Sequence, residues 1–170
     1  MKKIELTQGE FALVDDEDFE ELNKHKWHAH KEGGIFYAVR RVPCSSKGSK
    51  VRMHRQIMRV SYGIILDHID GNGLNNQKSN LRICTTSQNQ MNSSKRKDNT
   101  SGFKGVRWHK KTKKWEARIW VNNKWKYLGH HVTPEVAACA YNEAAKKYYG
   151  EFANLNPVAI SALEGVKGEK

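Results

Sequence analysis

Two polar residues at the end of an apolar run, followed at fixed intervals by two asparagines, constrain this chain more than any other feature. Asp67 and His68 follow an apolar run, and Asn80 and Asn89 come 12 and 21 positions after the histidine. The apolar run predicts a buried strand, and the apolar stretch after Asn80 predicts a second strand that leads into a helix. This strand, loop, strand, helix order would bring Asp67, His68 and Asn89 to one junction.

The residue types at this junction favour metal-assisted hydrolysis. A carboxylate and an amide oxygen suit a hard cation such as Mg²⁺, and a neighbouring imidazole can accept the proton of an attacking water. Taken singly, Asp67 and His68 could form a turn or a satisfied polar pair. Asn80 and Asn89 could be a turn residue and a helix-surface residue. The loop asparagines Asn72, Asn75 and Asn76 are expected to shape the loop rather than to bind metal.

Charge separates the chain into unequal parts. The net charge is +12, of which residues 1–92 carry +3, residues 93–100 carry +2 and residues 101–156 carry +7. Such a field favours a polyanionic partner. The sequence shows no apolar run of membrane-spanning length and no signal peptide, and its three dispersed cysteines form neither a zinc knuckle nor a disulfide framework. We therefore expect a protein of a reducing cytoplasm.

The first region, residues 1–92, is predicted to be rich in strands. Strand patterns cover residues 3–6, 11–14, 36–39 and 50–53, with a Pro/Ser/Gly turn between the last two, and residues 53–58 begin a short helix. The acidic run at 15–18 is expected to be the cap and first turn of a helix. A metal site is the alternative interpretation of that run.

Residues 53–92 resemble the HNH (ββα-metal) nuclease family, in its phage and intron-encoded homing endonuclease branch. The resemblance implies that Asp67 and Asn89 hold one divalent ion, Mg²⁺ or Mn²⁺, and that His68 is the general base. It also implies that Asn80 orients the His68 imidazole.

The role of His54 stays open at this point. It lies in the Met-His-Arg segment that precedes the motif in such proteins. The resemblance allows a catalytic contact with phosphate or leaving group, or a purely structural role.

Residues 93–101 are polar and basic, and we interpret them as a linker. The region that follows, residues 102–156, predicts three alternating strands at 105–109, 115–121 and 124–129, with a tight turn at Asn122-Asn123. Thr133-Pro134 is a helix start, the helix is expected over 135–149, and Gly150 ends it. Residues 157–170 are expected to be a flexible tail.

Alternation along these strands predicts one face against the helix and one outer face. Arg118 and Trp120 fall on the outer face, and we expect Trp108 and Trp115 in the core. A sheet that presents cations and aromatic rings suits a DNA groove. The alternative for Trp120 and Trp125 is that they pack in a small second core.

This region resembles the AP2/ERF DNA-binding domain, on the segments 103–107, 115–119, 127–129, the Ala-Ala-Tyr helix and Asn154-Leu155-Asn156. In that family a three-stranded sheet enters the major groove. The resemblance assigns DNA contacts to Lys104, Arg107, His109, Arg118, Trp120, Trp125 and Tyr127. Several positions that are Arg in plant members are His, Lys or Trp here, so the plant site preference does not transfer. The lysines at 110, 111, 113 and 114 suit phosphate contacts.

Together these patterns predict an α+β protein: a β-rich HNH domain over 1–92 and an AP2-like three-stranded antiparallel sheet packed on one helix. We expect a site-specific, divalent-metal-dependent endonuclease acting on double-stranded DNA, without a membrane or implied protein partner, in a bacterial or phage-infected cytoplasm. One such site cuts one strand, so a monomer should nick, and double-strand cleavage would need a homodimer or two binding events. A non-catalytic DNA-binding regulator is the main alternative, and an RNA-binding module is a third.

Overall fold

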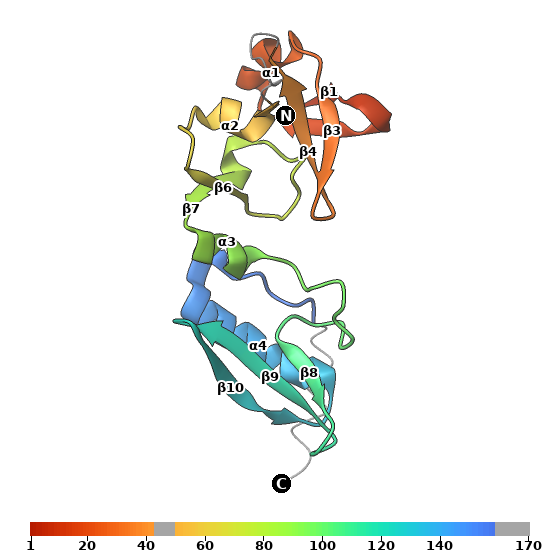
Figure 1. The fold of residues 1–170 in the computed structure, drawn as a ribbon, viewed down its shortest axis with the longest axis vertical. Helices are drawn as coiled ribbons and strands as arrows, with labels where there is room; N and C mark the ends of the chain where they lie inside the picture. Colours follow the sequence, from red (N-terminus) through yellow and green to blue (C-terminus); the bar gives the residue numbers. More distant parts are fainter. Residues whose placement is uncertain (43–49, 159–170) are drawn as a thin grey trace. The chain divides into compact units, whose positions relative to one another are not determined.

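Two compact units, Met1–Asn89 and Gln90–Lys170, make up the chain in this computed structural model (Figure 1). The structure describes residues 1–42 and 50–158. The Pro/Ser/Gly turn and most of the expected flexible tail lie outside these ranges. The predicted α+β class is confirmed, and in the described ranges no helix is both long and apolar enough to cross a lipid bilayer.

The first unit opens with a hairpin and a helix. Strands β1 (Lys2–Glu5) and β2 (Phe11–Val14) pair antiparallel, and α1 (Asp16–Asn23) follows. The acidic run forms the first turn of α1, as expected, where the helix dipole favours negative charge. These predicted elements are confirmed.

A three-stranded sheet and a short helix complete the support for the motif. The sheet has the order β3-β4-β5, with β3 (His28–Glu32), β4 (Ile35–Arg41) and β5 (Lys50–Arg52), and α2 (Met53–Met58) follows directly. Strand β3 was not predicted because its sequence His-Ala-His-Lys-Glu has no apolar alternation. Only Ala29 of that strand is buried.

The motif itself has the predicted strand, loop, strand, helix order. Strand β6 (Ile65–His68) pairs antiparallel with β7 (Leu81–Cys84), and α3 (Thr86–Asn92) begins two residues later. A 3-10 turn, η2 (Lys78–Asn80), leads into β7. The core beneath these elements consists of Ile4, Leu6, Ala12, Val14, Leu22, Trp27, Ala29, Ala38, Met53, Ile57, Leu74 and Leu81.

The first strands also brace the loop of the motif. The backbone of Leu13 in β2 bonds to Leu74 and Asn76, at 2.8 Å each. The Asp15 carboxylate accepts hydrogen bonds from Gln77 Nε2 and the Lys78 amide, at 3.1 and 2.8 Å. Asp15 therefore occupies the N-cap position of α1 while its side chain secures the loop 62 and 63 residues away.

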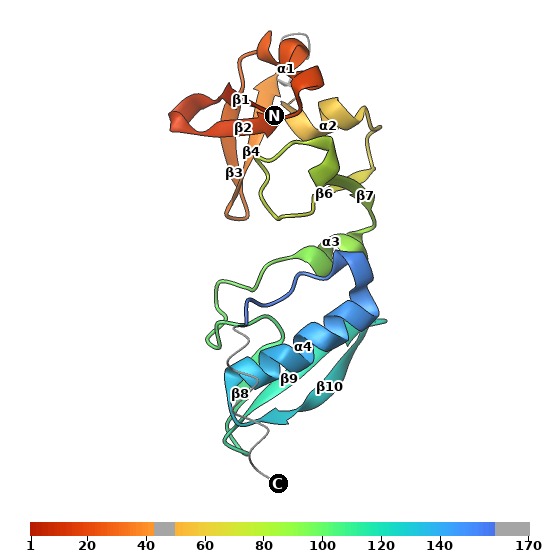
Figure 2. The same cartoon turned by 180° about the vertical axis from the view of Figure 1, so that it is seen from behind.

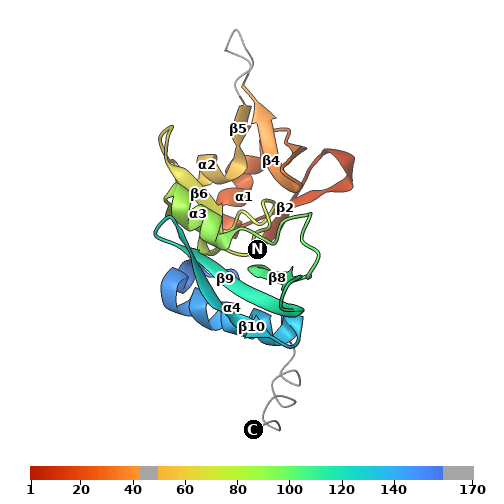
Figure 3. The same cartoon turned by 60° about the horizontal axis from the view of Figure 1, so that its bottom comes forward.

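The second unit is a three-stranded antiparallel sheet on one long helix. Strands β8 (Val106–His109), β9 (Lys114–Val121) and β10 (Lys124–His131) lie in the order β10-β9-β8, and α4 (Pro134–Tyr149) covers one face (Figures 2 and 3). The three strands, the helix and the turn are confirmed. Asn122 and Asn123 adopt φ of 50° and 59°, which asparagine tolerates in such turns.

The ends and the packing of α4 follow from its sequence. Thr133 Oγ1 accepts a hydrogen bond from the Val136 amide at 3.3 Å, and Gly150 ends the helix at a φ of 54° before the short turn η3 (Gly150–Phe152). Alanines face the sheet and are buried, which brings helix and strands close together. At Gly105, whose φ is +75°, any side chain would collide with the Tyr141 ring.

The segment expected to be a linker is tied to the second unit. Ser101 Oγ lies 2.8 Å from the Val106 carbonyl oxygen and 3.0 Å from that of Phe103, so its one proton can bond to either, and Asn99 Nδ2 donates to the Phe103 carbonyl at 2.9 Å. Just after this segment, the Asn156 side chain bonds to both the backbone amide and the backbone carbonyl of Lys104.

Candidate active site and nucleic-acid-binding face

Three aromatic side chains meet in the first unit, and we call them the histidine cluster: Tyr37, His54 and His68. The ring centroids of the two histidines lie 5.0 Å apart, and Tyr37 lies 5.9 Å from His68 and 6.0 Å from His54. The rings come from β4, α2 and the end of β6, and both histidines are buried. A side chain at Gly73 would collide with the Tyr37 ring, so this glycine permits the close approach of the loop.

Asn76 sets the tautomer of His68. Its side chain is 1% exposed, Nδ2 donates to the Leu74 carbonyl at 3.1 Å, and Oδ1 lies 3.3 Å from His68 Nε2. Since the Leu74 carbonyl fixes which end of the amide faces the ring, Nε2 is the nitrogen that donates. The neutral imidazole therefore keeps its lone pair on Nδ1, the nitrogen that can accept a proton.

Burial keeps both histidines neutral near neutral pH. Burial lowers the pKa of His54 to about 3, with further lowering by His68, Arg52 and Arg55. Burial also lowers the pKa of His68, although the hydrogen bond to Asn76 and the carboxylates Asp70 and Asp67 oppose that shift. A neutral imidazole is the protonation state that a general base needs.

The carboxylate next to His68 is buried in an ion pair. Asp67 Oδ2 accepts hydrogen bonds from Arg82 Nε and Nη2, at 3.0 and 2.8 Å, across the β6–β7 ladder. The exposed fractions of the two side chains are 8% and 11%. The pair holds Asp67 in one orientation and offsets the charge that burial would otherwise penalise.

Asn80 does not have the contacts expected of it. Its amide donates to Asp70 Oδ1 and to the Asn75 carbonyl, at 2.9 and 2.8 Å, and its Oδ1 accepts from the Asp70 amide at 3.0 Å. The His68 ring lies instead within hydrogen-bond distance of the Asn76 side chain. The physical reason is the turn at Lys78–Asn80, which directs the Asn80 side chain into the loop.

The same loop bonds hold Asp70 as a carboxylate. Burial acts to raise the pKa of Asp70, but the hydrogen bonds from Asn75, Asn72 and Asn80 outweigh it and lower that pKa. The loop asparagines thus shape the loop, as expected.

The residues expected to hold a metal ion fit a hard cation by their chemistry. Asp67 offers a carboxylate at the end of β6, and Asn89 offers an exposed amide on α3. Both are oxygen donors, which Mg²⁺ and Mn²⁺ accept. The helix that carries Asn89 directly follows β7, the partner of the strand that carries Asp67.

The outer face of the β8–β10 sheet presents rings and cations. Trp120 and Trp125 are 42% and 55% exposed with ring centroids 5.1 Å apart, and the Arg118 guanidinium lies 4.1 Å from the Trp125 ring. Tyr127, 57% exposed, pairs with Arg118 across the ladder. The alternative that these tryptophans fill a second core is wrong, because both rings are exposed: Trp120 alternates with the buried Ile119 on β9, and Trp125 pairs with Trp120 across the ladder.

Two residues expected to contact DNA are engaged within the second unit. The Lys104 ammonium donates to the Met91 and Ser93 carbonyls, at 2.6 Å each, and burial lowers its pKa to about 8. The Lys104 ammonium is therefore already bonded within its own unit, and its contact with DNA stays a prediction. Arg107 is exposed on that face, but it forms a two-pronged ion pair with Glu116.

The expectation for the remaining tryptophans is only half correct. Trp115 packs against the core formed with α4, whereas Trp108, at the end of the short strand β8, is 44% exposed and stands edge-on to Trp115. The lysines at 110, 111, 113 and 114 are all exposed.

Comparisons with known proteins agree with this geometry. A family model described as HNH endonuclease matches residues 52–91, and an AP2 domain model matches residues 101–151. An uncharacterized HNH endonuclease of Acanthamoeba polyphaga mimivirus is 33% identical over 157 residues, covering 89% of this chain and 77% of the relative. The chain belongs to the HNH endonuclease family.

Further relatives match one or both parts of this HNH endonuclease family member. Protein 3.8 of Escherichia phage T7 is 34% identical over 109 residues, covering 61% of this chain and 89% of that protein. An AP2-like ethylene-responsive transcription factor of Arabidopsis thaliana is 38% identical over 68 residues, covering 40% of this chain and 14% of the factor. No solved structure gives a significant match.

The structure adds three residues that sequence reasoning did not assign to the HNH site: Tyr37, Asn76 and Arg82. The sequence indicated only that Tyr37 and Arg82 lie in strands and that Asn76 is one of several asparagines in a loop. Their contacts join β4, the loop and β7 to the Asp67-His68 pair, so no local pattern could single them out.

Proposed function

We propose that this HNH family member is a divalent-metal-dependent DNA endonuclease of the homing type, in which His68 is the general base. The observation that carries the proposal is the buried His68 ring, whose Nε2 faces Asn76 Oδ1 at 3.3 Å while its neighbour Asp67 is held by Arg82. An imidazole fixed in one tautomer beside an oriented carboxylate is suited to activating water at a phosphodiester.

The protein residues would divide the reaction as follows. His68 Nδ1 would accept the proton of the attacking water, and Asn76 would stabilise the imidazolium through Nε2–H. Asp67 and Asn89 would hold one Mg²⁺ or Mn²⁺ ion, which would stabilise charge on the scissile phosphate and the departing 3′ oxygen. The products would carry 5′-phosphate and 3′-hydroxyl ends.

His54 would act as a neutral partner of His68. With a pKa near 3 it carries no charge near neutral pH, so it adds no repulsion when His68 accepts a proton. Its burial and its edge-on contact with His68 favour a positioning role over direct contact with phosphate.

The AP2 domain would choose the site. Its outer face would lie in the groove of double-stranded DNA, with Arg118 reaching bases or phosphates and Trp120, Trp125 and Tyr127 packing on sugars and thymine methyls. A single HNH centre would nick one strand, and double-strand cleavage would require two copies or two binding events.

A plasmid assay tests the proposal. Supercoiled plasmids that carry a library of phage or bacterial DNA would be incubated with the full chain in Mg²⁺ or in EDTA. The same assay would use His68→Ala and a matched control, His25→Ala, whose ring stands against Trp27 rather than in the histidine cluster. Binding to the same DNA would be measured in parallel.

We expect Mg²⁺-dependent nicking by the wild type and by His25→Ala, none in EDTA, and a loss of roughly a thousandfold in His68→Ala with binding retained. Mapping the nick would give the site. Tight duplex binding without cleavage of any substrate would replace the proposal with the non-catalytic regulator. Equal cleavage by His68→Ala would refute the assigned base.

A further inference from the structure

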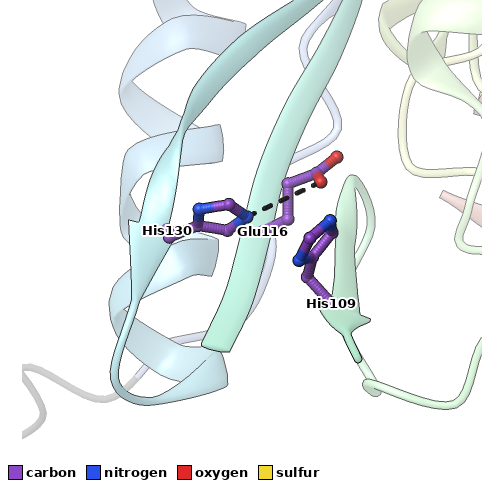
Figure 4. Close-up of side chains that lie close together, drawn as sticks. All are labelled: His109, Glu116 and His130. Atoms are coloured by element: carbon purple, nitrogen blue, oxygen red, sulfur yellow. Dashed lines mark ion pairs between the residues drawn. The ribbon is translucent and has the colours of Figure 1, made fainter. Parts of the chain in front are cut away.

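A second group of metal-capable side chains lies in the AP2 domain, on the outer face of its sheet. His109 is at the end of β8, Glu116 is on β9 and His130 is on β10, so each strand contributes one residue (Figure 4). In the ladder His130 stands directly opposite Glu116, and Arg107 is opposite Glu116 on the other side. Among the described residues, no other group of three or more His, Cys, Asp or Glu side chains lies close enough to share one ion.

The spacing of the three side chains approaches that of a metal site. One ligand atom from each lies within 4.8 Å of the others, and His130 Nε2 is 3.8 Å from Glu116 Oε2. Tetrahedral ligands bound at about 2.0–2.1 Å from a zinc ion lie about 3.3 Å apart. The ligand atoms would therefore have to approach one another by up to about 1.5 Å to share one ion.

His130 supplies an independent observation that points to a ligand at this group. Its Nε2 is buried and makes no hydrogen bond within the described part of the chain, although it points toward the Glu116 carboxylate (Figure 4). A buried polar atom without a partner is costly and calls for an explanation. An ion between His130 and Glu116 would satisfy it.

The surroundings prepare the other two ligands. His109 Nδ1 lies 2.8 Å from Thr112 Oγ1, which restrains the ring, and metal-bound imidazoles usually have such an outer partner. Glu116 is buried and is kept ionised: burial acts to raise its pKa, but the Arg107 hydrogen bond and charge outweigh this and lower that pKa. A carboxylate has enough lone pairs to bind an ion while Arg107 remains in contact.

The donor types select the kind of ion. Two imidazoles and one carboxylate match the three-ligand sets of zinc sites, and imidazole suits Zn²⁺ and similar transition metals far better than Mg²⁺. The Asp67 and Asn89 pair offers oxygen alone and suits the hard cation. The two units thus offer chemically different sites.

We propose that the AP2 domain of this chain binds one transition-metal ion of the Zn²⁺ class through His109, Glu116 and His130. The ion ties together all three strands of the outer face and leaves a coordination position for water or a phosphate oxygen. It also adds two positive charges to a face that already carries Arg118. This site does not depend on the nuclease reaction.

Calorimetric titration of Zn²⁺ into the untagged full chain, with Mg²⁺ in excess, tests the proposal. The ligand variants are His130→Ala and Glu116→Gln, the latter nearly equal in shape to the wild type. His131→Ala, next along the same strand, is the matched control. His68→Ala reports whether Zn²⁺ enters the histidine cluster instead. Co²⁺ would be used in place of Zn²⁺ to record a ligand-field spectrum, and circular dichroism would check folding.

We expect one Zn²⁺ per chain in the wild type, His131→Ala and His68→Ala, with a tetrahedral Co²⁺ spectrum and a raised melting temperature. His130→Ala and Glu116→Gln should weaken Zn²⁺ binding by more than about a hundredfold, beyond the 10–100-fold typical of losing an outer-shell partner. Wild-type affinity in folded His130→Ala or Glu116→Gln, no Zn²⁺ binding by the wild type, or loss of binding in His68→Ala would each overturn the site.

Discussion

The histidine cluster of the first unit and the outer face of the second both gather aromatic side chains, but in opposite environments. In the cluster His54 and His68 are buried, and burial lowers the pKa of both. On the outer face Arg118, Trp120 and Trp125 are partly or largely exposed and contact one another. A general base must be neutral and fixed in orientation before it accepts a proton, which burial provides. Recognition of a polyanion instead needs exposed cations and rings that can reach it.

Support for these two regions also differs in range. The cluster depends on strands and a loop that are distant in sequence, since Asp15 secures residues 77 and 78 and Tyr37 fills the space beside Gly73. The outer face depends on the alternation of two neighbouring strands joined by a two-residue turn. Substitutions should therefore have large, specific effects on the rate in the first unit and smaller, graded effects on affinity in the second.

The largest effect is expected from Asp67→Asn. The change keeps the shape and removes the charge of the proposed metal ligand, so cleavage under single-turnover conditions should fall on the order of a thousandfold while DNA binding persists. The variant also leaves Arg82 buried without its carboxylate, so the melting temperature should drop.

Asp16→Asn is the matched control, because Asp16 is exposed and its carboxylate pairs with the amino group of Met1, away from the histidine cluster. It should cut at the wild-type rate. A folded Asp67→Asn protein that needs no more Mg²⁺ than the wild type and cuts equally fast would remove Asp67 from the metal site.

A smaller loss of rate is expected from Asn76→Ala. Without the amide, His68 loses the partner that fixes its tautomer, and loss of such an orienting partner typically costs 10–100-fold. The loss should fall on the rate constant for bound DNA and spare the affinity. Kinetics over a range of DNA concentrations separates the two quantities.

Asn80→Ala provides the contrast, because the structure gives Asn80 a role in the loop through Asp70 and Asn75. It should lower the melting temperature more than it lowers the rate per folded molecule. The opposite pattern, a normal rate in Asn76→Ala and a large loss in Asn80→Ala, would restore the role that the family spacing assigns to Asn80.

Acid should destabilise the first unit through His54. Its pKa is about 3 in the folded protein and about 6.5 when unfolded, so protonation favours unfolding: the contribution is complete above pH 6.5 and is lost as pH falls toward 3. At pH 5 the loss is about 2 kcal/mol. His54→Phe should remove the part of the pH dependence that comes from His54 and leave the part from His68, measured by hydrogen exchange of the β4 amides between pH 7 and pH 5.

Local patterns predicted much of this fold. The strands over 11–14 and 115–121, the turn at Asn122-Asn123 and the Thr133-Pro134 helix start depend on neighbours in sequence, and all are present. The order of elements around Asp67 was predictable for the same reason. Strand β3 was missed because pairing with β4, rather than its own composition, makes it a strand.

The site was harder to predict where distant residues decide the contacts. Nothing in the sequence distinguishes Asn76 from Asn75, and the spacing of the motif pointed to Asn80, yet the fold brings Asn76 to His68. Lys104 looks like any cation on a basic face until its ammonium is seen bonded to two carbonyls. Lysine is rarely buried, so composition gave no warning.

The smallest effects should come from single changes on the outer face. Trp120→Ala removes one ring of a pair, and we expect duplex affinity to fall about fivefold, near 1 kcal/mol, because Trp125 still offers a surface for sugars and bases. The cleavage rate of DNA already bound should not change, since the ring is not part of the histidine cluster. Titration of labelled duplex, followed by single-turnover cleavage at saturation, measures both.

Lys111→Ala sharpens this last comparison, because Lys111 is exposed on the β8–β9 loop and carries charge without a ring. It should lower the affinity for all duplexes alike and reduce the slope of log affinity against log salt by about one, whereas Trp120→Ala should leave that slope unchanged and alter the preference among sequences. If Trp120→Ala changed the slope and not the preference, the ring would be acting through its cationic neighbour Arg118. The outer face would then be a phosphate-binding surface rather than a reader of sequence.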